Sequence, residues 1–250
     1  MTKRSPRLRT VNKTKPPYPL NDFGSKFPYL LGKEIVYLLA SKGKAVLEGS
    51  EWEEIFAYCI GANWKPSNVG LDDVVLGNTA WGAKTVKSTV KDFKNLKKVR
   101  LISGRNSPIY SYGGKIDKTI DPNFIGDQIL EIWNERVTSI REKYKNLRTI
   151  VLVKSNSLSQ VAVFEFETIR YESELFDFMW NKNGNLEGYN KNDHKKKFVW
   201  QPHGSQFTII ENVPDKSLII KLKKPKELDK SKILDAIGFD NSWVTVEKRE

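Results

Sequence analysis

The sequence has very few of the residues that build disulfide-bonded or zinc-containing domains. It has one cysteine, Cys59, so no intrachain disulfide can form, and a reducing compartment is expected. Its two histidines, His194 and His203, leave too few ligands for a structural zinc site. A cysteine nucleophile would need one of these distant histidines. A small buried apolar residue in a helix is therefore the preferred interpretation of Cys59.

Long hydrophobic runs are also missing. No segment is apolar for long enough to cross a bilayer, and the N-terminus lacks the apolar core of a signal peptide. We see no basic amphipathic helix with an aromatic apolar face that would favour a lipid surface. These absences predict a cytoplasmic protein with no membrane partner.

Acidic residues are too few to balance the basic ones. The 250 residues include 42 Lys and Arg against 30 Asp and Glu, a net charge of +12. A field of this sign attracts polyanions, so nucleic acid is the expected partner. The length and the 39% share of hydrophobic residues suit one large domain, or one domain with an appendage.

The first 15 residues contain no acid. They carry Lys3, Arg4, Arg7, Arg9, Lys13 and Lys15, and prolines follow at 16, 17 and 19. This pattern predicts a flexible basic N-terminal arm over residues 1–25, on a stiff proline spacer. A merely solubilising tail fits the pattern equally well.

Apolar periodicity predicts a helix over residues 48–60. Its stripe consists of Trp52, Ile55, Phe56, Cys59 and Ile60. On this helix Glu53 lies beside the stripe and can reach an inner surface, whereas Glu54 points the opposite way into solvent.

The following segments alternate between strand and helix signals. A hairpin is expected from strands at 71–76 and 80–90 with a Gly77-Asn78 turn, followed by a strand at 97–102. Asp121-Pro122 opens a long helix, and strands follow at 149–153, 161–166, 207–210 and 218–222, with a short helix at 230–237. The order predicts an α/β fold with a core sheet and a more β-rich C-terminal part.

Residues 70–87 carry the most informative chemistry. They place acids at the start of one hairpin strand and a lysine late in the next, so the two ends lie close together. Strand parity puts Lys84 on the face opposite Trp81, and Asp73 is preferred to Asp72 because it directly precedes an apolar run. Carboxylates hold a hard divalent cation, and a nearby ammonium offsets charge on a phosphate. A chance Asp and Lys flanking a hairpin is the competing explanation.

This arrangement resembles the PD-(D/E)xK nuclease superfamily, and within it the type II restriction endonucleases. The resemblance covers roughly residues 48–166 and includes the aromatic-Glu pair Trp52-Glu53 before the hairpin. It implies a restriction-endonuclease-like central mixed sheet flanked by helices, in a prokaryotic protein. It also implies roles: Asp73 binds Mg²⁺, the carbonyl of Ala83 is a further metal ligand, and Lys84 is placed near the attacking water.

The pattern departs from the family at one position. The acid expected two residues before the lysine is Gly82, and taking the motif from Lys87 puts Thr85 there instead. Glu53 is the candidate for the displaced acid, acting on a metal or through water.

Two segments are candidates for DNA recognition. The first is Arg105, Asn106 and Ser107, whose side chains suit phosphates or base edges, or alternatively hold their own loop. The second combines Gln201, His203, Ser205 and Gln206 with the lysines Lys195, Lys196 and Lys197. A turn between two strands beside a solvated lysine run explains the second segment about as well.

A further acidic set, Glu165, Glu167 and Asp177, has no lysine in the motif position and is interpreted as structural.

These observations lead to one organisation: the arm at 1–25, a catalytic core at 26–170, and recognition elements at 171–250 packed on the same domain. The expected activity is Mg²⁺-dependent cleavage of double-stranded DNA at a short sequence, by a homodimer if the target is palindromic. A non-catalytic DNA-binding protein, a nuclease acting on RNA or branched DNA, and a protein that meets an acidic partner protein remain alternatives.

Overall fold

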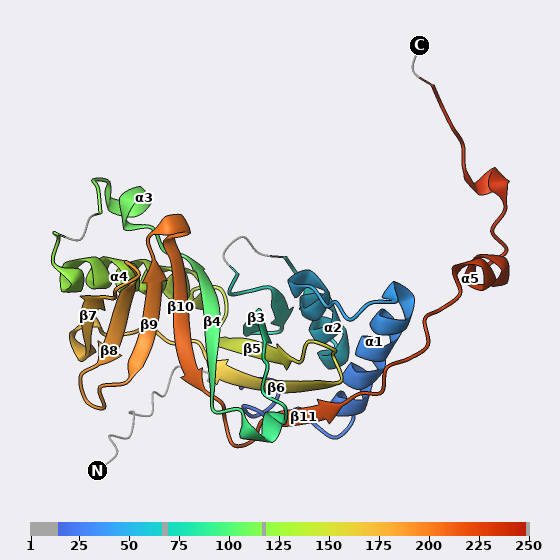
Figure 1. The fold of residues 1–250 in the computed structure, drawn as a ribbon, viewed down its shortest axis with the longest axis horizontal. Coiled ribbons are helices and arrows are strands. Elements are labelled where there is room, and N and C mark those ends of the chain that lie inside the picture. Colours follow the sequence, from blue (N-terminus) through green and yellow to red (C-terminus); the bar gives the residue numbers. More distant parts are fainter. Residues whose placement is uncertain (1–14, 67–69, 117–118, 249–250) are drawn as a thin grey trace.

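The computed structural model describes residues 15–66, 70–116 and 119–248. It is a mixed α/β structure with two sheets, and in this described part no helix is long and apolar enough to cross a membrane. Figure 1 shows the two sheets side by side, with α1 and α2 beside one and α4 beside the other. The helices are α1 (Phe27–Lys42), α2 (Gly49–Ile60), α3 (Pro108–Tyr112), α4 (Pro122–Arg141) and α5 (Lys230–Ala236).

The first sheet has the order β1-β2-β3-β5-β6-β11 and is mixed, because β3 and β5 run parallel while the other neighbours are antiparallel. Its strands are β1 (Asn63–Trp64), β2 (Val74–Leu76), β3 (Thr79–Lys87), β5 (Asn146–Lys154), β6 (Gln160–Glu167) and β11 (Leu218–Lys221). The predicted hairpin, the strands at 149–153 and 161–166, and the helix at 48–60 are confirmed.

The second sheet is antiparallel throughout, with the order β4-β10-β9-β8-β7. Its strands are β4 (Lys98–Arg105), β7 (Phe176–Trp180), β8 (Leu186–Asn190), β9 (Lys196–Gln201) and β10 (Gln206–Asn212). The chain therefore crosses between sheets, because β4 joins the second sheet and β11 returns to the first. Sequence order therefore does not follow the division between the two sheets.

Two apolar layers hold the first sheet in place. Trp81 and Ile150 face α1 and α2, whereas Ala80 and Leu147 face α4 and the second sheet. Strand alternation explains this split, because successive side chains of β3 and β5 point to opposite faces. The central residues of β5 are fully buried, as its β-branched run predicts.

Three features differ from the sequence-based expectations. Helix α1 is not among the predicted elements, although Phe27, Leu31, Ile35 and Leu39 recur at helical spacing and are all buried. Strand β4 continues to Arg105, beyond the predicted strand end at position 102. The predicted arm lies outside the described residues up to position 14, but Tyr18 and Asn21 are tied into the core by hydrogen bonds to Glu165.

Candidate active site

The candidate site lies where β2 begins and β3 is half complete. Asp73 immediately precedes β2 and is only 3% exposed. Its Oδ2 accepts a hydrogen bond of 3.0 Å from the main-chain N–H of Ala83, which fixes the carboxylate against β3. Since the N–H and C=O of one strand residue point to the same edge, the Ala83 carbonyl also faces the side of β3 on which Asp73 lies.

Lys84 shares this site with Asp73. Its Nζ donates a 3.0 Å hydrogen bond to the carbonyl of Gly70, and its side chain is half-buried. Burial lowers the pKa of Lys84, and the opposite charges of Asp73 and Glu53 act against that fall. Strand alternation places Lys84 on the face of β3 opposite Trp81, and its ammonium lies against the Gly70 carbonyl there.

The Asp73 carboxyl is electrostatically strained. Its pKa is raised from 3.8 to about 6, chiefly by burial and in smaller part by the charges of Glu53 and Asp72. The Lys84 ammonium and the Ala83 N–H oppose the rise. A buried carboxyl crowded by two other carboxyls is an environment that a divalent cation would relieve.

Glu53 joins the site from helix α2. It is half-buried, and its Oε2 accepts a hydrogen bond of 3.2 Å from Trp64 Nε1 on β1. Its charge acts on both Asp73 and Lys84, so α2 and the hairpin place these three side chains within electrostatic reach of one another. Glu54, one residue later, is exposed as expected.

Gly82 is glycine for a steric reason. A Cβ at this position would lie 2.9 Å from the Gly70 carbonyl oxygen and 3.0 Å from Leu71 Cα. Both are backbone atoms, which cannot move away as the end of a flexible side chain can. The strand therefore has no room for an acid here, and the Gly70 carbonyl lies where its side chain would begin.

The donor set available to a cation is small. It consists of the Asp73 and Glu53 carboxylates and, by strand geometry, the Ala83 carbonyl, all of them hard oxygen ligands of the type Mg²⁺ takes. Over the described ranges, no group of three or more His, Cys, Asp or Glu side chains is arranged to hold a metal ion. Mg²⁺ usually keeps several waters and takes one or two carboxylates, so the chemistry of this set fits it.

Arg136, which the sequence analysis does not single out, connects this site to the predicted recognition loop. Its Nη1 donates to the carbonyl of Ser103 (2.7 Å) and to Asn106 Oδ1 (2.9 Å), and its charge lowers the pKa of Lys84. Gly104 has a φ of +107° and packs against this guanidinium. One arginine within a helix carries no sequence signal for such a junction.

The two predicted recognition segments are neighbours in space. Arg105 pairs with Gln206 across β4 and β10, and Gln206 pairs with Gln201 across β10 and β9. The turn between β9 and β10 holds His203, which is exposed, and Ser205, whose carbonyl accepts from Asn106 N. Figure 1 shows this turn at the upper end of the second sheet, next to α3.

Asn106 is not placed to contact DNA, contrary to the prediction. It is fully buried, its Nδ2 donates to the Ile129 carbonyl (3.0 Å), and its own carbonyl accepts from Trp200 Nε1 (2.7 Å). Ser107 caps α3 by accepting from Tyr110 N. The alternative of a loop held by its own hydrogen bonds therefore describes Ser107. Asn106 is held instead by residues of α4, and Arg105 stays exposed.

The lysine run is paired with acids. Lys195 lies 3.0 Å from Asp193, Lys196 lies 2.6 Å from Glu187, and Lys197 lies 2.5 Å from Glu211. All three line one pocket of about 350 Å³ on the second sheet. A phosphate would have to compete with these carboxylates.

Among the acids interpreted as structural, Glu165 lies in the core, whereas Glu167 and Asp177 are exposed. Glu165 is fully buried and accepts from Tyr18 (2.7 Å), Trp81 (2.6 Å) and Arg148 (3.0 Å). The carboxylate oxygens of Glu165 thus accept hydrogen bonds from residues of the core. Cys59 is half-buried, and burial raises the pKa of its thiol to about 12, which agrees with an apolar role.

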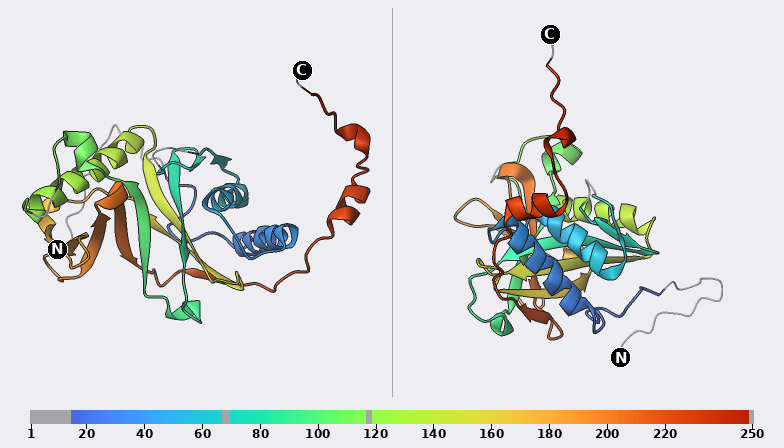
Figure 2. Two further views of the ribbon diagram at one scale, coloured as in Figure 1. Left: turned by 45° about the horizontal axis from the view of Figure 1, so that its top comes forward. Right: turned by 90° about the vertical axis from the view of Figure 1, so that its right-hand side faces the viewer.

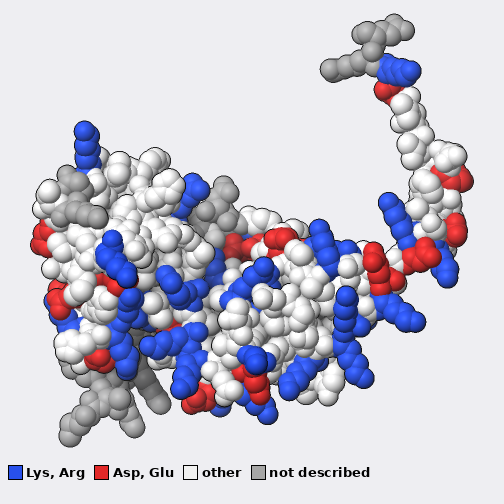
Figure 3. Space-filling model, viewed as in Figure 1, with Lys and Arg blue, Asp and Glu red and all other residues white. Residues whose placement is uncertain are grey.

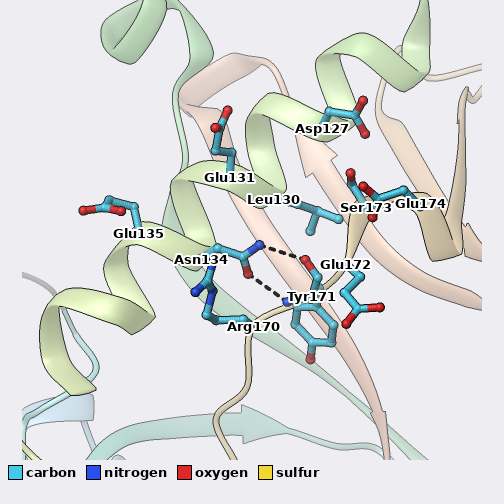
Figure 4. A pocket seen from close by; sticks show the side chains of 10 residues that line it. All are labelled: Asp127, Leu130, Glu131, Asn134, Glu135, Arg170, Tyr171, Glu172, Ser173 and Glu174. Carbon is cyan, nitrogen blue, oxygen red and sulfur yellow. Dashed lines mark hydrogen bonds between the residues drawn. The ribbon is translucent and has the colours of Figure 1, made fainter. Parts of the chain in front are cut away.

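A cavity of about 710 Å³ lies elsewhere, between α4 and the segment after β6 (Figure 4). Its walls carry Asp127, Glu131, Glu135, Glu172 and Glu174. Asn134 closes one side through paired 2.8 Å hydrogen bonds with the main chain of Tyr171. None of the predicted site residues lines this cavity, and its acidic walls do not suit a phosphate backbone.

The charge distribution differs from place to place. In Figure 3, basic side chains spread over much of the visible face, and a group of acidic side chains lies at its upper margin between the two halves.

Comparison of the chain with family models, curated proteins and solved structures finds no match.

Proposed function

We propose that this chain is a Mg²⁺-dependent endonuclease that cleaves double-stranded DNA at a short sequence, with a restriction-endonuclease-like core. One observation carries the proposal: Asp73 is held against β3 by the Ala83 N–H, Lys84 is held by the Gly70 carbonyl, and both lie within electrostatic reach of Glu53 on α2. The excess of basic residues supports a polyanionic substrate.

Each residue has a role in this proposal. Asp73, Glu53 and the carbonyl of Ala83 would hold Mg²⁺, which when bound supplies Lewis-acid stabilisation of the phosphate and a more acidic water. Lys84 donates one N–H to Gly70, which orients the ammonium beside Asp73. From there it offsets negative charge on the scissile phosphate and orients a water for attack. The charge of Asp73 opposes the fall in the pKa of Lys84 that burial causes.

Recognition is assigned to Arg105, Gln201, His203 and Gln206, which are exposed or half-exposed on neighbouring strands and their turn. Arg suits a guanine edge or a phosphate, and Gln suits adenine. A palindromic target would be cut by a homodimer, since the two-fold axis of the DNA is matched by that of the protein.

Plasmid cleavage tests the activity. Wild-type protein with Mg²⁺ should give discrete bands that disappear with EDTA and with Lys84→Ala. Lys87→Ala is the matched control, because Lys87 is an exposed lysine at the end of the same strand. Equal loss in both variants, or cleavage by Lys84→Ala, would contradict the assignment.

Non-catalytic DNA binding is the second candidate. It is favoured by Gly82, where backbone atoms replace the acid that the nuclease motif would carry. Tight, salt-dependent DNA binding with no cleavage under any divalent cation would select it.

A further inference from the structure

The C-terminal tail, residues 229–248, leaves the body of the protein with apolar side chains exposed. Figures 1 and 2 show α5 and the following segment extending away from both sheets. Trp243 is 59% exposed and Val246 is 79% exposed, and the other large exposed apolar residues are Ile233, Ile237, Phe239 and Val244. So many apolar side chains on about 20 residues mark a surface that binds a partner.

The tail also has an unusual charge pattern for this chain. Its lysines, Lys230, Lys232 and Lys248, lie near its two ends, and residues 233–247 between them contain Asp235, Asp240 and Glu247 and no Lys or Arg, although the whole chain carries +12. The partner surface should therefore combine apolar area with positive charge.

The protein itself has such a surface. A groove of about 570 Å³ runs between α1 and β11, with Lys33, Lys221 and Lys223 on its rim and apolar side chains such as Tyr29 and Ile219 in its walls. Tyr29 is 83% exposed. Among the described strands, β11 ends the first sheet, so an extended segment with β-branched residues such as Val244-Thr245-Val246 can lie along it.

The path of the chain favours the groove of another copy. Leu222 lies beside Gly32 in the first half of α1, and Leu228 N donates to the carbonyl of Ala40 at its far end. The tail thus leaves α1 at the end opposite the groove and continues outward (Figure 2).

We propose that the C-terminal tail of one chain binds the groove between α1 and β11 of a second copy, and that two copies exchange tails about a two-fold axis. Each copy then contributes about 20 tail residues and receives as many, which is on the scale of about 20–30 residues per side in a stable interface. The reciprocal exchange closes the assembly at a dimer. This inference does not rest on nuclease activity.

Analytical ultracentrifugation of the full chain over a dilution series tests the proposal. A concentration-dependent dimer is expected. Trp243→Asp or Ile237→Asp should raise the dissociation constant of this dimer about tenfold or more, as for loss of a buried anchor. Tyr110→Asp is the matched control, since Tyr110 is exposed but lies outside the tail and groove. A monomer at every concentration, or a dimer indifferent to the tail variants, would overturn the proposal.

Two further measurements identify the groove and the exchange. Lys33→Glu with Lys221→Glu should dissociate the dimer, and adding Asp235→Lys and Glu247→Lys should restore it. The variant Lys33→Glu with Lys221→Glu keeps its tail, and Trp243→Asp keeps its groove. A mixture of the two should therefore form heterodimers through the one tail and the one groove that remain intact. If the mixture stays monomeric while small-angle scattering shows a compact wild-type monomer, the tail binds its own groove and exchange is wrong.

Discussion

At the scale of single residues, Asp73 combines a proposed catalytic role with a cost to folding. Its pKa of about 6 lies above the ordinary 3.8, mainly because the carboxyl is buried. The folded protein thus holds the proton more tightly than the unfolded chain. The corresponding stability is present below about pH 4 and is lost as the pH rises through about 6.

Asp73→Asn should therefore stabilise the protein at pH 8 in EDTA, by on the order of 2 kcal/mol. The amide oxygen still accepts from the Ala83 N–H, while the buried charge is gone. Denaturant unfolding at pH 8 and pH 4 checks this expectation, because the gain should vanish at the lower pH. The same variant should lose cleavage, and a loss of stability at pH 8 would contradict the electrostatic account.

Gly82→Asp, which restores the acid of the nuclease motif, should not improve activity. Its Cβ would meet the Gly70–Leu71 backbone, so we expect destabilisation of about 1–3 kcal/mol, as for other overpacked sites. Gly82→Ala should show most of the same loss in thermal unfolding. An unchanged melting temperature for Gly82→Ala would contradict this expectation, because it would show that the Gly70–Leu71 backbone moves to accommodate the added Cβ.

At the scale of elements, Asn106 joins β4, α4 and the turn between β9 and β10. Asn106→Ala removes a buried amide that bonds to Ile129 and Arg136, so it should cost about 2–4 kcal/mol of unfolding free energy. Asn106→Asp is a sharper comparison, because it keeps an acceptor for Arg136 but loses the donor to Ile129. Urea unfolding monitored by tryptophan fluorescence measures both, and a change below about 0.5 kcal/mol would contradict the junction role.

At the scale of the whole molecule, the charge of +12 predicts strongly salt-dependent DNA binding. With about four phosphate contacts, affinity should fall about a hundredfold between 50 and 200 mM salt. Fluorescence anisotropy with a labelled duplex measures the slope. An affinity indifferent to salt would contradict a backbone-contact surface, whatever the catalytic outcome.

The sequence alone determined most elements of the first sheet. Periodicity defined α2, Asp121-Pro122 marked the start of α4, and the apolar run of β5 showed a strand buried on both faces. These signals are local, because burial imposes a period on each segment by itself. Parity along β3 likewise separated Lys84 from the Trp81 face.

Only the tertiary structure decided how distant segments meet. It paired Arg105 with Gln206, buried Asn106, placed Arg136 between the two, and filled the position of a Gly82 side chain with the Gly70 backbone. It also brought Glu53 within electrostatic reach of Asp73, on which the hypothesis of a displaced acid depends. Such contacts join residues far apart in sequence, and the local pattern around each residue carries no record of them.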